Sequence, residues 1–168
     1  AQLELLCSVN DSLYIIQPTQ VGAYPTELQW ADLGNGHYAA TFGDTDADGA
    51  QELLVKDFED YFVFEPLPDP TAGFRNSATL ADISPDYQGS VAPRIFVENL
   101  DGDSNPDIVY GDFDGDFLIY EHQGGENYVN TWIDSTDLQK SGTYLETGDF
   151  DNDGQAEIFV AAHTSFLR

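Results

Sequence analysis

Three acidic loops of nine residues carry the chemistry of this sequence. They occupy residues 44–52, 99–107 and 149–157, and are called loops one, two and three below. In each loop, positions 1, 3, 5 and 9 are Asp, Glu or Asn, and an apolar run begins directly after position 9. Carboxylates packed this densely repel one another unless a cation lies among them. Several oxygen ligands in one tight turn suit calcium, so the loops predict up to three calcium sites.

The elements that hold these loops are predicted to be short β-strands. The position-9 carboxylates of Glu52, Asp107 and Glu157 lie 55 and 50 residues apart, a period typical of propeller blades. The apolar runs are rich in β-branched and aromatic residues, and Gly, Pro, Asn and Asp separate them. No stretch keeps the 3.6-residue apolar period of a helix. We therefore predict an all-β chain of β-propeller blades, each made of four antiparallel strands.

The repeat divides the chain into four predicted units. They are a partial blade at 1–33, a blade at 37–83, a blade at 92–135 and a partial blade at 142–168. An apolar residue at Trp30, Leu80 and Trp132 marks the last strand of three units. Because few propellers have fewer than four blades, we expect a partial propeller that belongs to a longer one. The alternative is a part-ring that pairs between chains, and either arrangement predicts strand edges that need partners.

The loops resemble those of the FG-GAP/VCBS repeat family, the calcium-loop blades of integrin α-subunit heads and of many bacterial secreted proteins. Phe42-Gly43 before loop one matches the first half of the FG-GAP name, and Val160-Ala161-Ala162-His163 is a loose version of the second half. The resemblance implies that calcium binds the side chains at positions 1, 3, 5 and 9 and the carbonyl at position 7. The implied ligands are Asp44, Asp46, Asp48, Ala50 and Glu52 in loop one, Asn99, Asp101, Asp103, Asn105 and Asp107 in loop two, and Asp149, Asp151, Asp153, Gln155 and Glu157 in loop three.

Loop two departs from this pattern at three positions. Asn99 removes one negative charge at position 1, and Ser104 replaces the glycine that eases the turn at position 6. Pro106 restricts the backbone just before the last ligand. We therefore expect loop two to bind calcium most weakly of the three.

Other polar patterns are interpreted as structural. Residues 112–116 read Asp-Phe-Asp-Gly-Asp, but the ninth position of that pattern is Tyr120, so we interpret them as a hairpin turn. The histidines His37, His122 and His163 share no metal-ligand spacing and are predicted to lie at the surface or at strand ends. No nucleophile motif and no Gly-rich phosphate loop occurs in the sequence, so we expect that the chain is not an enzyme.

Charge and composition restrict the partners of the chain. The formal net charge is −26 with five basic residues, and such a surface repels nucleic acid and anionic lipid. No apolar run is long enough to span a membrane. Cys7 is the one cysteine, so no disulfide forms within the chain, and it is predicted to be a buried small apolar residue. Calcium loops of this kind fill best where calcium is plentiful, which favours a secreted or cell-surface protein.

Three functional hypotheses are consistent with these features. The first is a calcium-stabilised extracellular module for recognition, adhesion or assembly, without catalysis, whose partner is a protein or glycan ligand or a neighbouring blade or subunit. The second is the scaffold domain of a secreted polysaccharide-degrading enzyme, which would need a basic or histidine-containing cleft. The third is a subunit of an extracellular filament or surface layer. The choice among them rests on family analogy, because a fold alone does not fix a function.

Overall fold

The computed structural model describes most of the chain. The described residues are 4–37, 39–57, 60–69, 72–81, 95–111, 116–135 and 145–160. All regular structure within these ranges is β-strand, which confirms the predicted all-β fold. Among the same residues, no helix is long and apolar enough to cross a membrane. Residues 112–115 of the predicted hairpin turn, and residues 161–163 of the GAP-like sequence with His163, lie outside the described ranges.

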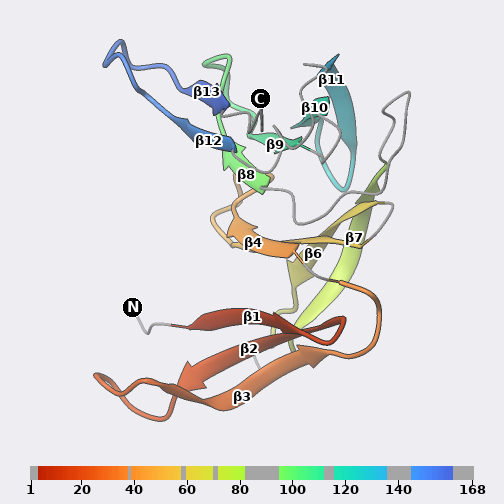
Figure 1. The fold of residues 1–168 in the computed structure, drawn as a ribbon, viewed down its shortest axis with the longest axis vertical. Helices are drawn as coiled ribbons and strands as arrows, with labels where there is room; N and C mark the ends of the chain where they lie inside the picture. Colours follow the sequence, from red (N-terminus) through yellow and green to blue (C-terminus); the bar gives the residue numbers. More distant parts are fainter. Residues whose placement is uncertain are drawn as a thin grey trace, which may run out of the picture.

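The described strands form four antiparallel sheets (Figure 1). The first sheet contains β1 (Leu5–Val9), β2 (Ser12–Pro18) and β3 (Pro25–Asp32). The second contains β4 (Ala39–Gly43), β5 (Glu52–Lys56), β6 (Tyr61–Pro66) and β7 (Phe74–Leu80). The third contains β8 (Ile95–Glu98), β9 (Asp107–Gly111), β10 (Asp116–His122) and β11 (Tyr128–Ser135). The fourth contains β12 (Leu145–Gly148) and β13 (Glu157–Val160).

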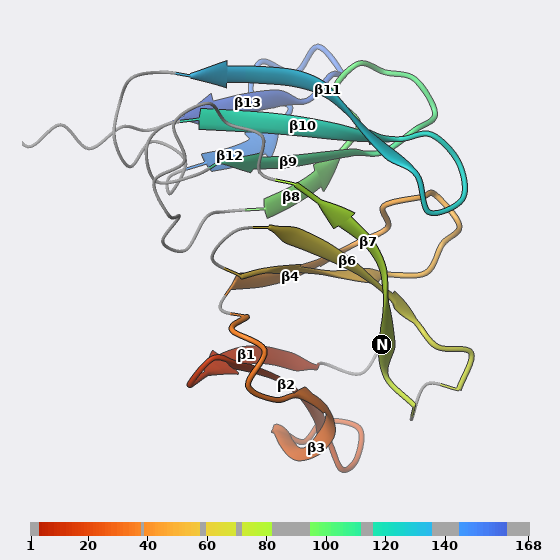
Figure 2. The same ribbon diagram turned by 90° about the vertical axis from the view of Figure 1, so that its right-hand side faces the viewer.

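Each sheet is a meander in which strands adjacent in sequence are hydrogen-bonded neighbours. The second and third sheets have four strands each, which confirms the predicted four-stranded antiparallel blades. The sheets follow one another as an open stack along the molecule (Figures 1 and 2). The turn between β1 and β2 consists of Asn10 and Asp11, whose φ values of 49° and 58° are those of a tight hairpin turn.

A β-bulge recurs in β2, β6 and β10, where each strand shifts register against the strand that follows it. The residues that pair with the position just before the bulge are Trp30, Ala78 and Trp132. The predicted equivalence of Leu80 with the two tryptophans is therefore wrong by two residues. Leu80 pairs instead with Tyr61, at the start of β6.

Alternate side chains of each strand pack against the preceding and the following sheet, as the two faces of a strand require. In β5, Leu53 and Val55 belong to an apolar cluster with Leu13 of the first sheet. Leu54 belongs to a second cluster, which contains Tyr110 of the third sheet. The strands β5 and β9 are buried along their whole length. The two acidic loops that end at these strands are therefore attached to fully buried strands.

Two tyrosines hold the second and third sheets together. The rings of Tyr61 and Tyr110 are both fully buried, and their centroids lie 3.6 Å apart. Each hydroxyl donates a hydrogen bond to the opposite sheet or its flank, from Tyr61 to the carbonyl of Gly111 at 3.3 Å and from Tyr110 to the carbonyl of Ala81 at 3.2 Å. Gly43 lies so close to the next sheet that a Cβ there would overlap the side chain of Val97. The sheets therefore pack at very short range just beside loop one.

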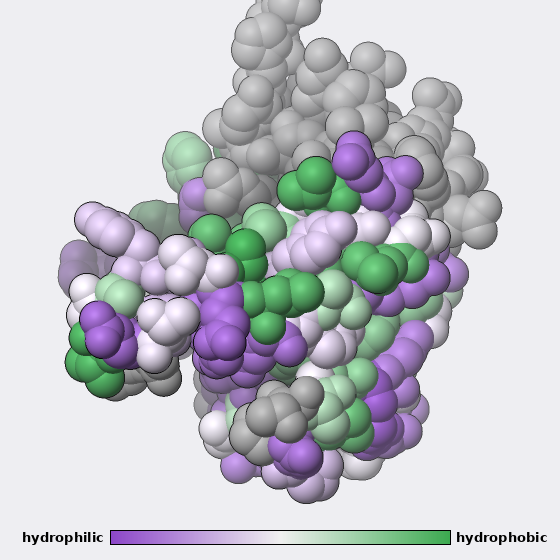
Figure 3. Space-filling view, turned by 90° about the horizontal axis from the view of Figure 1, so that it is seen from below, coloured by the Kyte–Doolittle hydropathy of each residue, from purple (hydrophilic) through white to green (hydrophobic). Residues whose placement is uncertain are grey.

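The outer face of the first sheet carries apolar side chains in contact with solvent. Leu5, Val9 and Leu28 are 50%, 51% and 58% exposed. Seen from this end of the molecule, apolar and polar side chains are mixed over the described surface (Figure 3). Cys7 is only partly buried, so its predicted burial is incomplete.

Candidate metal sites

Each acidic loop connects two neighbouring strands of one sheet, β4 to β5, β8 to β9 and β12 to β13. Position 9 is the first residue of the second strand in every case. Glu52 is fully buried and Asp107 is 5% exposed, whereas Glu157 is half-buried. The position-9 carboxylates therefore lie where the loops meet the packed sheets.

The backbone of each loop turns around its own carboxylates. The N–H of position 2 donates to the position-9 carboxylate in all three loops, at 2.5 Å for Thr45, 2.9 Å for Leu100 and 2.8 Å for Phe150. The N–H groups of positions 5 and 7 donate to the carboxylates of positions 3 and 5. These shared bonds orient the acidic side chains of positions 3, 5 and 9 in each loop. The residue at position 7 is Ala50, Asn105 or Gln155. Its N–H donates to the position-5 carboxylate, and its carbonyl remains a predicted metal ligand.

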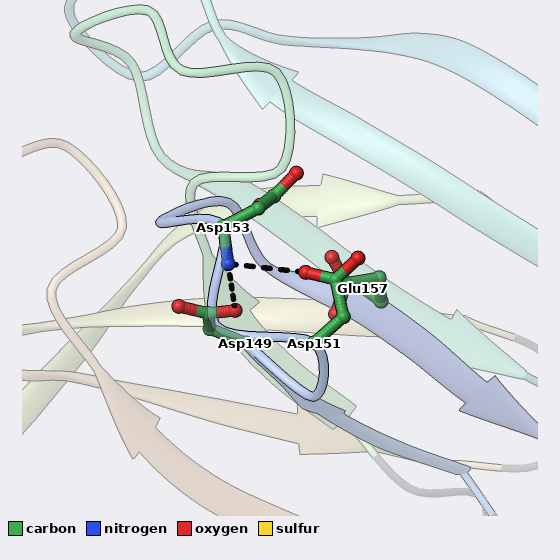
Figure 4. Close-up of side chains that lie close together, drawn as sticks. All are labelled: Asp149, Asp151, Asp153 and Glu157. Atoms are coloured by element: carbon green, nitrogen blue, oxygen red, sulfur yellow. Dashed lines mark hydrogen bonds between the residues drawn. The ribbon is translucent and has the colours of Figure 1, made fainter.

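The carboxylates of loops one and three come together closely enough to hold a metal ion. In loop three, Asp149, Asp151, Asp153 and Glu157 each offer one oxygen, and these oxygens all lie within 4.8 Å of one another (Figure 4). In loop one, Asp44, Asp46 and Asp48 form a similar group. Oxygens on opposite sides of a calcium ion are about 4.8 Å apart, because each binds at roughly 2.4 Å. The spacing in both loops therefore fits calcium.

Glu52 provides the clearest sign that loop one requires a cation. Its Oε2 accepts hydrogen bonds from the backbone N–H and the hydroxyl of Thr45, whereas its Oε1 is buried without a hydrogen-bond partner. Oδ1 of Asp44 is also buried without a partner. Unpaired buried carboxylate oxygens are costly, so a cation in contact with either oxygen would stabilise the fold.

The electrostatics of Glu52 agree with this geometry. Burial raises the pKa of Glu52 to about 7, although the hydrogen bonds from Thr45 lower it, and the nearby carboxylates of Glu65 and Asp46 raise it further. A bound cation would favour the ionised form instead. The donor set of loop one that fits calcium is therefore Asp44, Asp46 and Asp48. Glu52, the predicted fourth side-chain ligand, does not belong to this group in the described part of the chain.

Loop two is organised differently. Oδ1 of Asn99 accepts from the N–H of Gly102 at 2.8 Å, and its Nδ2 donates to the carbonyl of Asp103 at 2.5 Å. The amide of Asn99 thus bonds to the loop backbone. Among the described residues, Asp101, Asp103 and Asp107 do not form a group of the kind found in loops one and three. The position-1 side chain of loop two is therefore tied to the loop backbone through both ends of its amide.

Position 4 of the loops is a constraint that sequence analysis missed. Ala47, Gly102 and Asn152 all adopt the left-handed region, with φ of 61°, 79° and 62°. The sequence pattern required such a conformation only at position 6, where Gly49 and Gly154 have φ of 91° and 93°. Gly and Asn tolerate this region, so Gly102 and Asn152 could have indicated a left-handed residue at position 4. An alanine in the same conformation, as at Ala47, is strained.

Three further residues near the loops were also missed. The hydroxyl of Tyr128 lies 2.7 Å from that of Thr45. Glu65 lies close enough to loop one that, after burial, Asp46 and Asp48 are the main causes that raise its pKa. Glu121 accepts a hydrogen bond from Nδ2 of Asn105 at 3.1 Å. All three come from strands outside the loops.

The two described histidines bond locally. Nδ1 of His37 lies 2.5 Å from a carboxylate oxygen of Asp32, and Nε2 of His122 lies 2.9 Å from the carbonyl of Gly125. His37 is 6% exposed and His122 is 9% exposed, so the predicted surface position is wrong, although His122 is the last residue of β10. Neither belongs to a metal-ligand group among the described residues.

Comparison with known proteins identifies the repeat. Residues 99–160 match the model of the FG-GAP-like repeat. This segment is an FG-GAP-like repeat. It begins at position 1 of loop two and ends at the last residue of β13, so it includes loops two and three and the strands between them. No curated protein and no solved structure matches the chain.

The geometry of the three loops predicts a ranking of their candidate metal sites. Asp46→Ala or Asp151→Ala should lower the melting temperature in calcium by about 5–10 °C, because each removes a carboxylate from a gathered group. Asp101→Ala should have a smaller effect, because loop two is held by the amide of Asn99. Thermal melts of the three variants with and without calcium measure this difference, and the reverse order would show that charge clustering does not control the affinity.

The strained position 4 predicts a stabilising substitution. Ala47→Gly should increase the free energy of unfolding by about 0.5–1 kcal/mol, because glycine adopts a φ of 61° without the strain that alanine carries. Asn152→Ala is the matched opposite change at position 4 of loop three and should destabilise the protein. Urea denaturation checks both values, and equal stability of all variants would refute the assigned backbone strain.

Proposed function

We propose that this chain is a calcium-stabilised module of β-propeller type that acts outside the cell in recognition, adhesion or assembly and does not catalyse a reaction. The observation that supports it most is the pair of buried oxygens, Oε1 of Glu52 and Oδ1 of Asp44, that lack hydrogen-bond partners beside the acidic group of loop one. A calcium ion would satisfy both. Its role would be structural, since it would fix the loop between two strands and add its binding energy to folding.

An extracellular setting follows from the demand for calcium. Loops whose candidate calcium ligands are mainly exposed side chains, as in loop three, fill best where free calcium is abundant. The net charge of −26 disfavours nucleic acid and anionic lipid as partners. The partners we propose are therefore a protein or glycan ligand, or a neighbouring blade or subunit.

A non-catalytic role is proposed because the acidic residues have a structural explanation. Seven of the carboxylates belong to the groups in loops one and three that could hold a metal ion. The two described histidines bond to Asp32 and to the carbonyl of Gly125. With only five basic residues in the sequence, the chain offers little to bind an acidic polysaccharide substrate.

Binding assays in calcium and in chelator test the proposed function. The protein would be applied to glycan arrays and to a panel of extracellular proteins, with the double variant Asp46→Ala/Asp151→Ala and the exposed-carboxylate control Glu27→Ala. We expect binding in calcium that is lost with chelator, lost in the double variant and kept in the control. Release of new sugar ends from a polysaccharide by the purified chain would contradict the proposal and favour an enzyme.

A further inference from the structure

Loop one differs from the other two loops at position 2. This position is Thr45 in loop one but Leu100 and Phe150 in loops two and three, so only loop one has a hydroxyl there. Thr45 is fully buried, and its Oγ1 lies 2.9 Å from Oε2 of Glu52. The same Oγ1 lies 2.7 Å from the hydroxyl of Tyr128, the first residue of β11 in the third sheet. A calcium loop of the second sheet is thus bonded to the neighbouring sheet through residues 83 positions apart.

The direction of these hydrogen bonds follows from the number of protons available. The Thr45 hydroxyl donates its single proton to Oε2 of Glu52. Thr45 must then accept the proton that Tyr128 donates. Burial, with Glu52, Asp46 and Glu65 nearby, raises the pKa of Tyr128 to about 12, so its hydroxyl keeps that proton at physiological pH. The chain of donors runs from Tyr128 through Thr45 to Glu52.

We infer that Tyr128 is a positioning residue for the calcium site of loop one, so that metal binding in the second sheet and docking of the third sheet reinforce each other. The inference rests on the calcium binding of the proposed function. By bonding to Thr45, Tyr128 fixes the group that holds Oε2 of Glu52, which leaves Oε1, buried without a hydrogen-bond partner, available to a metal. Groups that orient a ligand in this way strengthen metal binding, and the coupling is reciprocal.

A second contact joins the same two sheets near loop one. Nη2 of Arg75 on β7 lies 2.6 Å from Oε1 of Glu126, two residues before Tyr128. Both side chains are about half exposed, so this ion pair contributes little by itself. The buried hydroxyl contact of Tyr128 is therefore the one that transmits the state of loop one.

The test compares two tyrosines of the same interface. Tyr128→Phe removes the hydroxyl bonded to loop one, whereas Tyr120→Phe removes a hydroxyl that donates to the carbonyl of Ala81, outside the three loops, at 2.7 Å. Calorimetric titration of metal-stripped protein with calcium should show that Tyr128→Phe weakens one site about tenfold. The Tyr120→Phe variant should bind calcium as tightly as the original chain, and its melting temperature should fall equally with and without calcium.

Substitutions at Thr45 complete the test. Thr45→Val should weaken the same site, Thr45→Ser should restore it, and adding Tyr128→Phe to Thr45→Val should cause no further loss, because both act through one hydroxyl. Unchanged calcium affinity in Tyr128→Phe, or additive losses in the double variant, would overturn the inference. If the original chain takes up no calcium, the proposed function fails as well, whereas normal uptake with an unaffected Tyr128→Phe variant overturns this inference alone.

Discussion

Chelation of calcium should lower the melting temperature of this protein by about 5–10 °C for each loop that was filled. A site with ligand at a hundred times its dissociation constant stabilises the folded state by about 2.7 kcal/mol, and a chain of this size melts about 2–4 °C lower for each kcal/mol lost. The effect should be large here because the metal would satisfy buried oxygens of Glu52 and Asp44. Differential scanning calorimetry in calcium and in chelator measures it.

Magnesium is the control for this experiment. At the same concentration it should restore less stability than calcium, because several carboxylates in one small loop suit a larger ion that takes more ligands. Identical melting curves in calcium and in chelator would refute a stabilising role for the metal.

Tyr110→Ala should reduce the free energy of unfolding by about 3–5 kcal/mol. Tyr110 is fully buried between the second and third sheets, its ring lies 3.6 Å from that of Tyr61, and its hydroxyl bonds to Ala81 across the interface. The substitution would leave a cavity and remove that bond. Urea denaturation in calcium gives the value.

Tyr24→Ala is the matched control for this substitution. Tyr24 is 87% exposed, so its removal should change the stability by less than about 0.5 kcal/mol. A cost for Tyr110→Ala that is no larger than that of Tyr24→Ala would show that the two sheets do not share one core.

Much of the fold could be predicted from local sequence pattern. Short apolar runs bounded by turn residues predict strands such as β5 and β9, because a strand buried on both faces is apolar along its length. The gathering of Asp149, Asp151, Asp153 and Glu157 also follows from spacing, since a nine-residue turn brings alternate side chains to its inside. Features that lie within one loop or one strand could therefore be predicted from the sequence.

Features that depend on packing between sheets could not be predicted from the sequence. The contact of Tyr128 with Thr45 joins residues 83 positions apart, and no local pattern marks it. Leu80 was predicted to be the equivalent of Trp30 and Trp132 because it is a large apolar residue at nearly the same spacing. The strand pairing shows that Ala78, opposite Val63, is the equivalent residue. His37 and His122 were expected at the surface or at strand ends, and His122 does end β10. Both are nevertheless buried, because local hydrogen bonds satisfy their ring nitrogens.

Anomalous diffraction from crystals grown in calcium tests the central claim most directly. Data collected at a wavelength where calcium scatters anomalously should show one peak in loop one, bound by Asp44, Asp46, Asp48 and Oε1 of Glu52. A second peak should lie in loop three, among the carboxylates of Asp149, Asp151, Asp153 and Glu157. The absence of a peak in both loops, with Oε1 of Glu52 hydrogen-bonded to a water or protein donor instead, would contradict calcium as the ion that holds these blades.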